Sequence, residues 1–215
     1  MKKTFLLVCL IALCTLTVLA QTGKELRSGH TDRAATRLAP KDGSSGLATI
    51  FSNLGPASDL YTDYYWFIDE IQDVGSAFTP AANAHVSQVQ VSVQHFAGPK
   101  LIYVWIFSDS GGYPDTILEG PVAVTKIPEG GTCCDLAVAD FLPLPVYAGQ
   151  PYWVVVTTAM AGNETNFEGG WYWGNPGFPP PVSFDLGPHW SNRPTYQNAG
   201  VLVLGTWDPT SLGCD

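Results

Sequence analysis

Apolar and polar residues alternate along much of the chain with a period of two, which is the pattern of a half-buried β-strand. The clearest example is residues 86–96, VSQVQVSVQHF, in which Val89, Val91 and Val93 alternate with polar residues. Residues 101–107, LIYVWIF, are apolar at every position, as expected for a central strand covered on both faces. Further runs rich in β-branched or aromatic residues predict strands at 121–127, 136–141, 147–158 and 199–207.

Glycine and proline separate these runs. The chain of 215 residues contains 22 Gly and 17 Pro, which fall mainly between the apolar runs and mark turns. Beyond the N-terminal apolar run, no window of about ten residues keeps a helical period without a Gly, a Pro or a β-branched run. The pattern predicts an all-β protein of about eight to ten strands, folded as an antiparallel two-sheet β-sandwich with a jelly-roll-like architecture.

The N-terminus has the organisation of a secretory signal peptide. Lys2 and Lys3 form a basic start, residues 5–19 are apolar, and the run ends in the small residue Ala20. This run is shorter than the roughly twenty residues that a membrane-spanning helix needs. We therefore predict cleavage after Ala20 and a secreted protein, extracellular or periplasmic, whose mature chain has no membrane span.

Composition divides the rest of the chain into three parts. Residues 21–47 are polar without an apolar period, which predicts a flexible leader. Residues 48–210 are predicted to form a single sandwich domain, followed by a short tail at 211–215. Without the two signal-peptide lysines, 8 basic residues face 19 acidic ones, a net charge of −11. Such a charge argues against nucleic acid and anionic membrane surfaces as partners.

Three cysteines follow the predicted cleavage site: Cys133, Cys134 and Cys214. Export exposes them to an oxidising compartment, where disulfides form. Because the number is odd, at least one cysteine is left over unless two chains pair. Either the adjacent pair closes on itself, or one member of that pair bonds Cys214. The sequence does not choose between these pairings.

Residues 109–112, Asp-Ser-Gly-Gly, are the residues that surround the nucleophilic serine in chymotrypsin-like proteases. Such a serine needs a nearby histidine base and a carboxylate behind it, and the candidate base, His85, lies only 25 residues before Ser110. Asp and Ser that bond their own backbone, followed by two glycines with positive φ, also make a turn between strands. We therefore predict a turn rather than a nucleophile.

Two groups of acidic residues are candidates for a chemical role. Asp109 and Asp115 flank the turn and are candidate ligands for a structural calcium ion, which takes six to eight oxygen ligands. Asp69 and Glu70 are adjacent, and neighbouring residues of a strand point to opposite faces. That geometry is poor for the paired carboxylates of a glycosidase.

Aromatic residues concentrate between residues 167 and 190. Trp171, Tyr172 and Trp173 alternate as in a strand, so the two tryptophans share one face. Flat rings on one face of a sheet can stack on sugars, although large aromatics more often fill a core. Trp190 lies in a more polar stretch and is a better surface candidate. The candidate ligand-binding residues are Trp171, Tyr172, Trp173, Trp190, Asn192 and Arg193.

Two motifs resemble the secreted bacterial β-sandwich domains of the "choice-of-anchor" group. Residues 108–114 match that group's Asp-x-Gly-Gly-x-Pro turn, with Asp115 where glycine is usual, and residues 148–153 match a later strand that begins Gly-x-x-Tyr-Trp. The resemblance covers residues 48–207 and implies a sandwich fold without established catalytic residues. Members of the group carry a C-terminal sorting signal. None is seen here, so we expect release outside the cell.

The sequence thus predicts a secreted, non-enzymatic β-sandwich that acts as a binding or structural module at the cell exterior, with a glycan or matrix component as partner. The alternative is a polysaccharide-acting hydrolase or lyase on a jelly-roll scaffold. That enzyme requires a groove holding two acids, or an acid with His and Arg. No cofactor other than structural calcium is expected, and the oligomeric state is left open.

Overall fold

The computed structural model describes residues 27–30, 46–56, 59–160, 163–174, 182–185, 190–192 and 197–209. Within these ranges the chain is built of β-strands and turns, without an α-helix. The signal peptide, the 211–215 tail, Arg193 and Cys214 lie outside the described residues, as does the side chain of Asn192.

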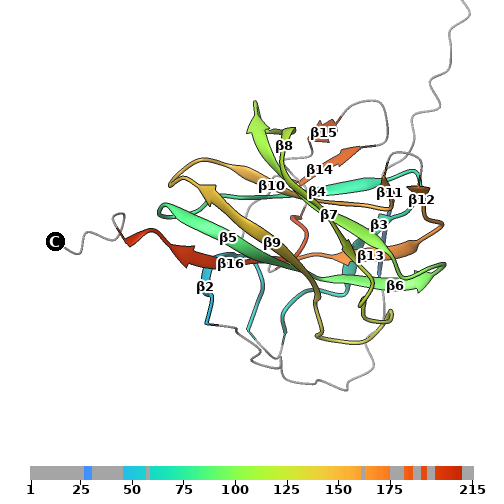
Figure 1. Cartoon of the computed structure of the whole chain (residues 1–215). Helices are drawn as coiled ribbons and strands as arrows, with labels where there is room; N and C mark the ends of the chain where they lie inside the picture. Colours follow the sequence, from blue (N-terminus) through green and yellow to red (C-terminus); the bar gives the residue numbers. More distant parts are fainter. Residues whose placement is uncertain are drawn as a thin grey trace, which may run out of the picture.

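One layer of the molecule is a six-stranded antiparallel sheet (Figure 1). Its strand order is β15-β14-β4-β10-β7-β8. The buried central strand predicted at 101–107 is β7, and the strand predicted at 147–158 contributes β10. The bounds are β4 (Asp73–Phe78), β7 (Ile102–Ser110), β8 (Tyr113–Val124), β10 (Tyr152–Thr157), β14 (Val182–Asp185) and β15 (Trp190–Asn192).

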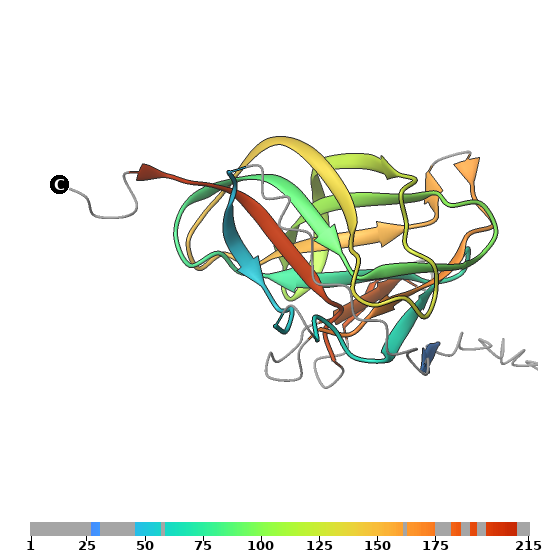
Figure 2. The ribbon, with the colours of Figure 1, turned by 90° about the horizontal axis from the view of Figure 1, so that it is seen from below.

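The second layer consists of two four-stranded antiparallel sheets that continue into each other. In one, β16 lies between β2 and β5 (Figure 2), in the order β2-β16-β5-β9. The other has the order β1-β3-β13-β6. The bounds are β2 (Ala48–Ser52), β5 (Ala84–Val91), β9 (Ala137–Val146), β16 (Val201–Trp207), β1 (Ser28–His30), β3 (Tyr64–Ile68), β13 (Glu168–Tyr172) and β6 (Val93–Ala97).

Ser92, between β5 and β6, joins these two sheets. Its N–H donates to the Gly200 carbonyl (3.2 Å), and its own carbonyl accepts from the Tyr172 N–H (3.0 Å). The buried Ser92 hydroxyl donates to the Tyr172 carbonyl (2.8 Å). A short hairpin, β11 (Ala159–Met160) and β12 (Asn163–Glu164), follows β10.

The core lies between the layers and is filled by alternate residues of their strands. Ile102, Val104 and Ile106 of β7 pack with Val89 and Val91 of β5, all with no exposed surface. Burying such a side chain stabilises the fold by about 1.5–3 kcal/mol. The period of two read from the sequence is therefore the period with which β5 and β7 face the core.

The all-β class and the antiparallel sandwich are confirmed, but the described residues contain more strands than the eight to ten expected. The additional ones are mostly short strands of two to four residues, such as β11, β12 and β14. The leader prediction was wrong for one segment: Ser28–His30 pair with β3 instead of remaining unstructured.

The six-stranded sheet curls so strongly that β15, at one edge, lies against β8, at the other (Figure 1, top). Gly75 on β4 marks the inside of the curl. A Cβ there would lie 3.4 Å from the Pro114 ring and 3.5 Å from the Trp190 ring. The face of this sheet that points away from the main core is therefore partly enclosed.

Candidate functional site

Aromatic side chains cover the enclosed face of the six-stranded sheet. On β7 the residues that alternate with the core positions include Trp105 and Phe107, and β15 adds Trp190. These three partly exposed rings pack on Trp153 and Val155 of β10, which are completely buried. We call Trp105, Phe107 and Trp190 the aromatic face.

Hydrogen bonds hold two of the indoles in this region. The Trp105 Nε1–H donates to the Thr157 hydroxyl (3.1 Å), and the Trp153 Nε1–H donates to Asp109 Oδ1 (2.7 Å). The ring centroids of Trp105 and Phe107 are 6.4 Å apart, and those of Phe107 and Trp190 are 6.5 Å apart. Rings fixed in this way present an ordered apolar surface, because little rotamer freedom remains to be lost on binding.

Of the predicted ligand residues whose side chains the structure describes, only Trp190 lies on this face. Trp105 and Phe107 were not predicted, because the sequence 101–107 is apolar throughout and does not show which face is covered. The exposed Ile117 is paired with Phe107 and extends the apolar surface onto β8. These three rings can be recognised as one group only from the strand order of the folded protein, which places β7 and β15 in one curled sheet.

Trp171 and Tyr172 lie in the interior. Trp171 is 0 % exposed, and its Nε1–H donates to the Gly200 carbonyl (2.8 Å). Trp173 is partly exposed and stacks on Tyr64, with ring centroids 5.0 Å apart. Its Nε1 is buried without a hydrogen-bond partner in the part of the chain that is described. Trp171 and Tyr172 therefore pack in the core and not on a surface platform.

The Asp-Ser-Gly-Gly segment forms the turn between β7 and β8, as predicted. Ser110 is paired with Tyr113, and the two glycines between them have positive φ angles of 63° and 86°. The Gly112 N–H donates to Asp109 Oδ2 (3.1 Å). His85 lies on β5, in the other layer.

The two carboxylates proposed for calcium lie on opposite sides of the β7–β8 hairpin. Asp109 is paired with Pro114 and so shares its face, whereas the next residue, Asp115, points the other way. Both oxygens of Asp109 already accept N–H bonds. Among the described residues no three His, Cys, Asp or Glu side chains are grouped closely enough to hold a metal ion. Structural calcium stays a prediction that this geometry does not favour.

A polar cavity of about 520 Å³ lies beside the start of β1 and the end of β3. Asp69 is 5 % exposed, pairs with the Arg27 guanidinium and accepts a bond from the Ile71 N–H (3.0 Å). Glu70 is exposed and lines the same cavity as Asp69. The lining residues are Arg27, Asp69, Glu70, Ile71, Asn166, Phe167 and Glu168. Sequence reasoning missed this cavity, because its walls come from segments far apart in the chain.

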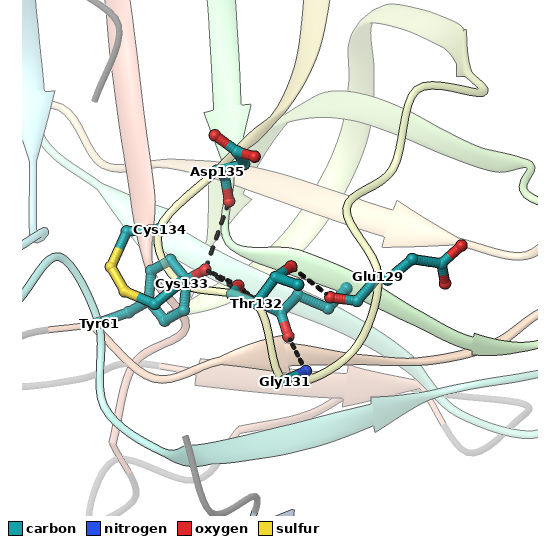
Figure 3. The surroundings of a disulfide bond; sticks show 8 residues. Tyr61, Glu129, Gly131, Thr132, Cys133, Cys134 and Asp135 are labelled. Atoms are coloured by element: carbon teal, nitrogen blue, oxygen red, sulfur yellow. Dashed lines mark hydrogen bonds between the residues drawn. A yellow bond between two sulfur atoms is a disulfide. The ribbon is translucent and has the colours of Figure 1, made fainter. Parts of the chain in front are cut away.

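The two adjacent cysteines form a disulfide, Cys133–Cys134, which selects the first of the two predicted pairings (Figure 3). Both cysteines are buried against Tyr61, Tyr65 and Tyr172. The Tyr61 hydroxyl reaches the carbonyls of Thr132 (3.3 Å) and Asp135 (3.4 Å) on either side of the pair. Burial raises the pKa of Tyr65 above its usual value.

The loop that carries this disulfide, residues 125–136, is fastened to β6. The buried Gln94 side chain accepts from the Gly131 N–H (2.9 Å) and donates to the Tyr61 hydroxyl (2.8 Å) and to the Thr132 carbonyl. Glu129 bonds His95 Nδ1 (3.0 Å) and Lys100 Nζ (2.6 Å). The bonds from Lys100 and His95 lower the pKa of Glu129.

The fold and these surfaces define an antiparallel β-sandwich protein with an aromatic face on its six-stranded sheet. No protein-family model matches the chain, and no curated protein matches it. The resemblance to the choice-of-anchor group therefore stays a prediction that rests on residues 108–114 and 148–153. The described residues include no helix long and apolar enough to cross a membrane.

Proposed function

We propose that this protein is an exported, non-enzymatic β-sandwich module that binds a glycan at the cell exterior through the aromatic face. The observation that carries the proposal is the set of three partly exposed rings, from Trp105, Phe107 and Trp190, on one face of one sheet. Export rests on the predicted signal peptide, and the sandwich is the kind of domain expected from the choice-of-anchor resemblance.

The chemistry of the aromatic face suits sugars. A sugar ring presents C–H groups on its flat faces and hydroxyls around its edge. An aromatic ring carries negative charge density on its face, so it attracts the weakly positive C–H groups. The indole N–H group of Trp105 bonds within the protein, so this ring contributes mainly its face. Such a surface favours stacking along a chain of sugars over recognition of a single charged group.

The test is retention of the mature protein on insoluble polysaccharides and on a glycan array, compared with Trp105→Ala and Trp190→Ala variants. Loss of about 1.4 kcal/mol of contact free energy weakens binding about tenfold, and we expect at least this loss from either substitution. The matched control is Tyr147→Ala, because Tyr147 is an exposed ring that follows β9 in the other layer. Equal retention of all four proteins, or retention of none, would overturn the proposal.

A second candidate function is a polysaccharide-acting hydrolase or lyase, which the polar cavity favours. Asp69, Glu70 and Glu168 line the cavity together with Arg27, so it supplies the two acids in one groove that such an enzyme requires. Asp69 is already engaged by Arg27 and Ile71, so Glu70 and Glu168 are the candidates for acid–base work. Release of soluble sugar during the retention assay would support this enzyme over the binding module.

A further inference from the structure

Residues 27–30, which comprise Arg27 and β1, bind along β3, where β1 forms an added edge strand. Its register is antiparallel, with Ser28 opposite Trp66, Gly29 opposite Tyr65 and His30 opposite Tyr64. Without β1, β3 would be the edge of its sheet, because the order is β1-β3-β13-β6. An open sheet edge offers unpaired backbone groups to any extended peptide. The segment therefore occupies a place where peptides in general can bind.

A buried side chain recognises the backbone of this segment. Gln72 is 1 % exposed, and its amide accepts from the Arg27 N–H (2.8 Å) and donates to the Arg27 carbonyl (3.0 Å). The same amide donates to the Phe67 carbonyl (2.7 Å), and the Phe67 N–H donates to the Arg27 carbonyl (3.1 Å). Because a buried amide without partners is costly, Gln72 is well suited to an extended peptide backbone at this position.

The side chain of Arg27 has its own site. Its guanidinium pairs with the buried carboxylate of Asp69 and lies 4.6 Å from the centre of the Phe67 ring. The guanidinium thus contacts a carboxylate and an aromatic face together, an arrangement that favours arginine over lysine. The Arg27 side chain remains 42 % exposed, so it binds on the surface of the domain rather than in its core.

The position two residues later accepts only glycine. A Cβ on Gly29 would overlap the ring and hydroxyl of Tyr65. Tyr65 is itself buried among Phe67, Phe96 and Tyr172, so its ring has no room to move aside. The following residue, His30, packs against the Tyr64 ring with centroids 4.7 Å apart.

The distribution of charge also favours the binding of a basic segment at the β3 edge. Residues 21–47 carry five basic and three acidic residues, whereas residues 48–215 carry three basic and sixteen acidic ones. The leader is therefore positive, and the body to which it binds is strongly negative. Opposite charges favour the encounter of a basic peptide with this surface.

We propose that the β3 edge, with Asp69, Gln72 and Tyr65, is a peptide-binding site for extended segments of the type Arg-x-Gly. Arg27-Ser28-Gly29 is its resident ligand. A basic Arg-x-Gly segment of another protein is the partner that competes for the site. This site is independent of the aromatic face and of glycan binding.

The test begins with the full mature chain carrying Gly29→Val, which displaces the resident segment and leaves the acceptor unchanged. A fluorescent synthetic peptide with the sequence of residues 24–33 is titrated against it, with anisotropy as the readout. We expect saturable binding to Gly29→Val and at least about tenfold weaker binding to the wild-type chain, because a tethered segment acts at an effective concentration in the millimolar range. Circular dichroism checks that the variant is folded, and Arg27→Glu is a second way to release the segment.

Two matched controls make the outcome specific. A peptide in which Gly29 is replaced by valine should not bind, and a chain with Gly29→Val and Asp69→Asn should bind the normal peptide at least about fivefold more weakly. Hydrogen exchange at the Phe67 amide adds a readout without a label, since excess peptide should restore its protection in Gly29→Val. Equal binding of both peptides, or no binding to either released chain, would overturn the proposal.

Discussion

At the scale of single residues, Asp109 supports both the β7–β8 turn and the aromatic face. One carboxylate oxygen accepts from the Gly112 N–H in the turn, and the other accepts from Trp153 Nε1–H beneath the aromatic face. Trp153 is completely buried, and the Asp109 carboxylate is the partner that its N–H finds in the fold. The segment first considered for a nucleophilic serine thus matters through its aspartate.

We predict that Asp109→Ala lowers the free energy of unfolding by about 1–3 kcal/mol, because a buried N–H donor is left without a partner. Urea unfolding followed by tryptophan fluorescence measures the change. Asp115→Ala is the control, since Asp115 is exposed on the other side of the hairpin and bonds only the neighbouring Thr116 hydroxyl among the bonds described. Equal destabilisation by both substitutions would contradict the proposed role of Asp109.

The sequence predicted the conformation of the β7–β8 turn well, but it predicted poorly which aromatic side chains lie on the surface and which lie in the core. Gly111 and Gly112 were predicted to hold positive φ because their neighbours are turn formers, and both do. The aromatic face that Trp105 and Phe107 form is completed by β15, which is distant in sequence and too short to show a period. Trp171 has the same alternation as a surface platform, and only its position between the layers puts it in the core.

At the scale of elements, the disulfide loop, residues 125–136, is attached to the domain through charged as well as neutral bonds. Glu129 bonds His95 and Lys100, and both bonds lower its pKa. A carboxyl group with a lowered pKa in the folded state stabilises that state fully above its ordinary pKa. The contribution is lost as the pH falls through the lowered value.

We therefore predict that Glu129→Gln lowers stability at pH 7, and that the difference from wild type shrinks as the pH falls below the ordinary pKa of 4.5 and disappears below the lowered pKa of Glu129. Urea unfolding of both proteins across this pH range checks the prediction. In a chain that also carries Lys100→Met, the stability difference between Glu and Gln at position 129 should be smaller, because Lys100 is the largest cause of the lowered Glu129 pKa. A difference that persists unchanged at low pH would show that Glu129 acts by packing rather than by charge.

Elements differed in how well the sequence predicted them. Strands β5, β7, β10 and β16 were expected, because each is long enough to show alternation or a continuous apolar run. β1 was not, since its three residues, Ser-Gly-His, contain no apolar side chain. Its pairing depends on Asp69 and Gln72, more than forty residues away, and no local pattern reports such partners.

At the scale of the whole molecule, charge is divided between the leader and the body. Three basic and sixteen acidic residues in 48–215 face a leader with an excess of two positive charges. Part of the attraction between them crosses solvent, because Arg27 is partly exposed. Salt screens such interactions, with a screening length that falls from about 30 Å at 0.01 M to about 3 Å at 1 M.

We predict that raising the salt concentration from about 0.01 M to about 1 M weakens the binding of β1 to β3. Hydrogen exchange at the Phe67 amide, which donates to the Arg27 carbonyl, should become faster over this range. The amide of Val155, a completely buried residue of the central strand β10, is the internal control and should not respond. If both amides respond alike, salt acts on the whole fold rather than on the leader.

The attachment of β1 also has a consequence for proteolysis. Arg33, Arg37 and Lys41 lie in the sequence between β1 and β2, and each is a cleavage site for a trypsin-like protease. A single cut at one of them would leave residues 27–30 bound only by the contacts with β3. The resident strand would then become a separate peptide that diffuses away on dilution. A protease would in this way turn a peptide site that is occupied by its own chain into one that is open to partners.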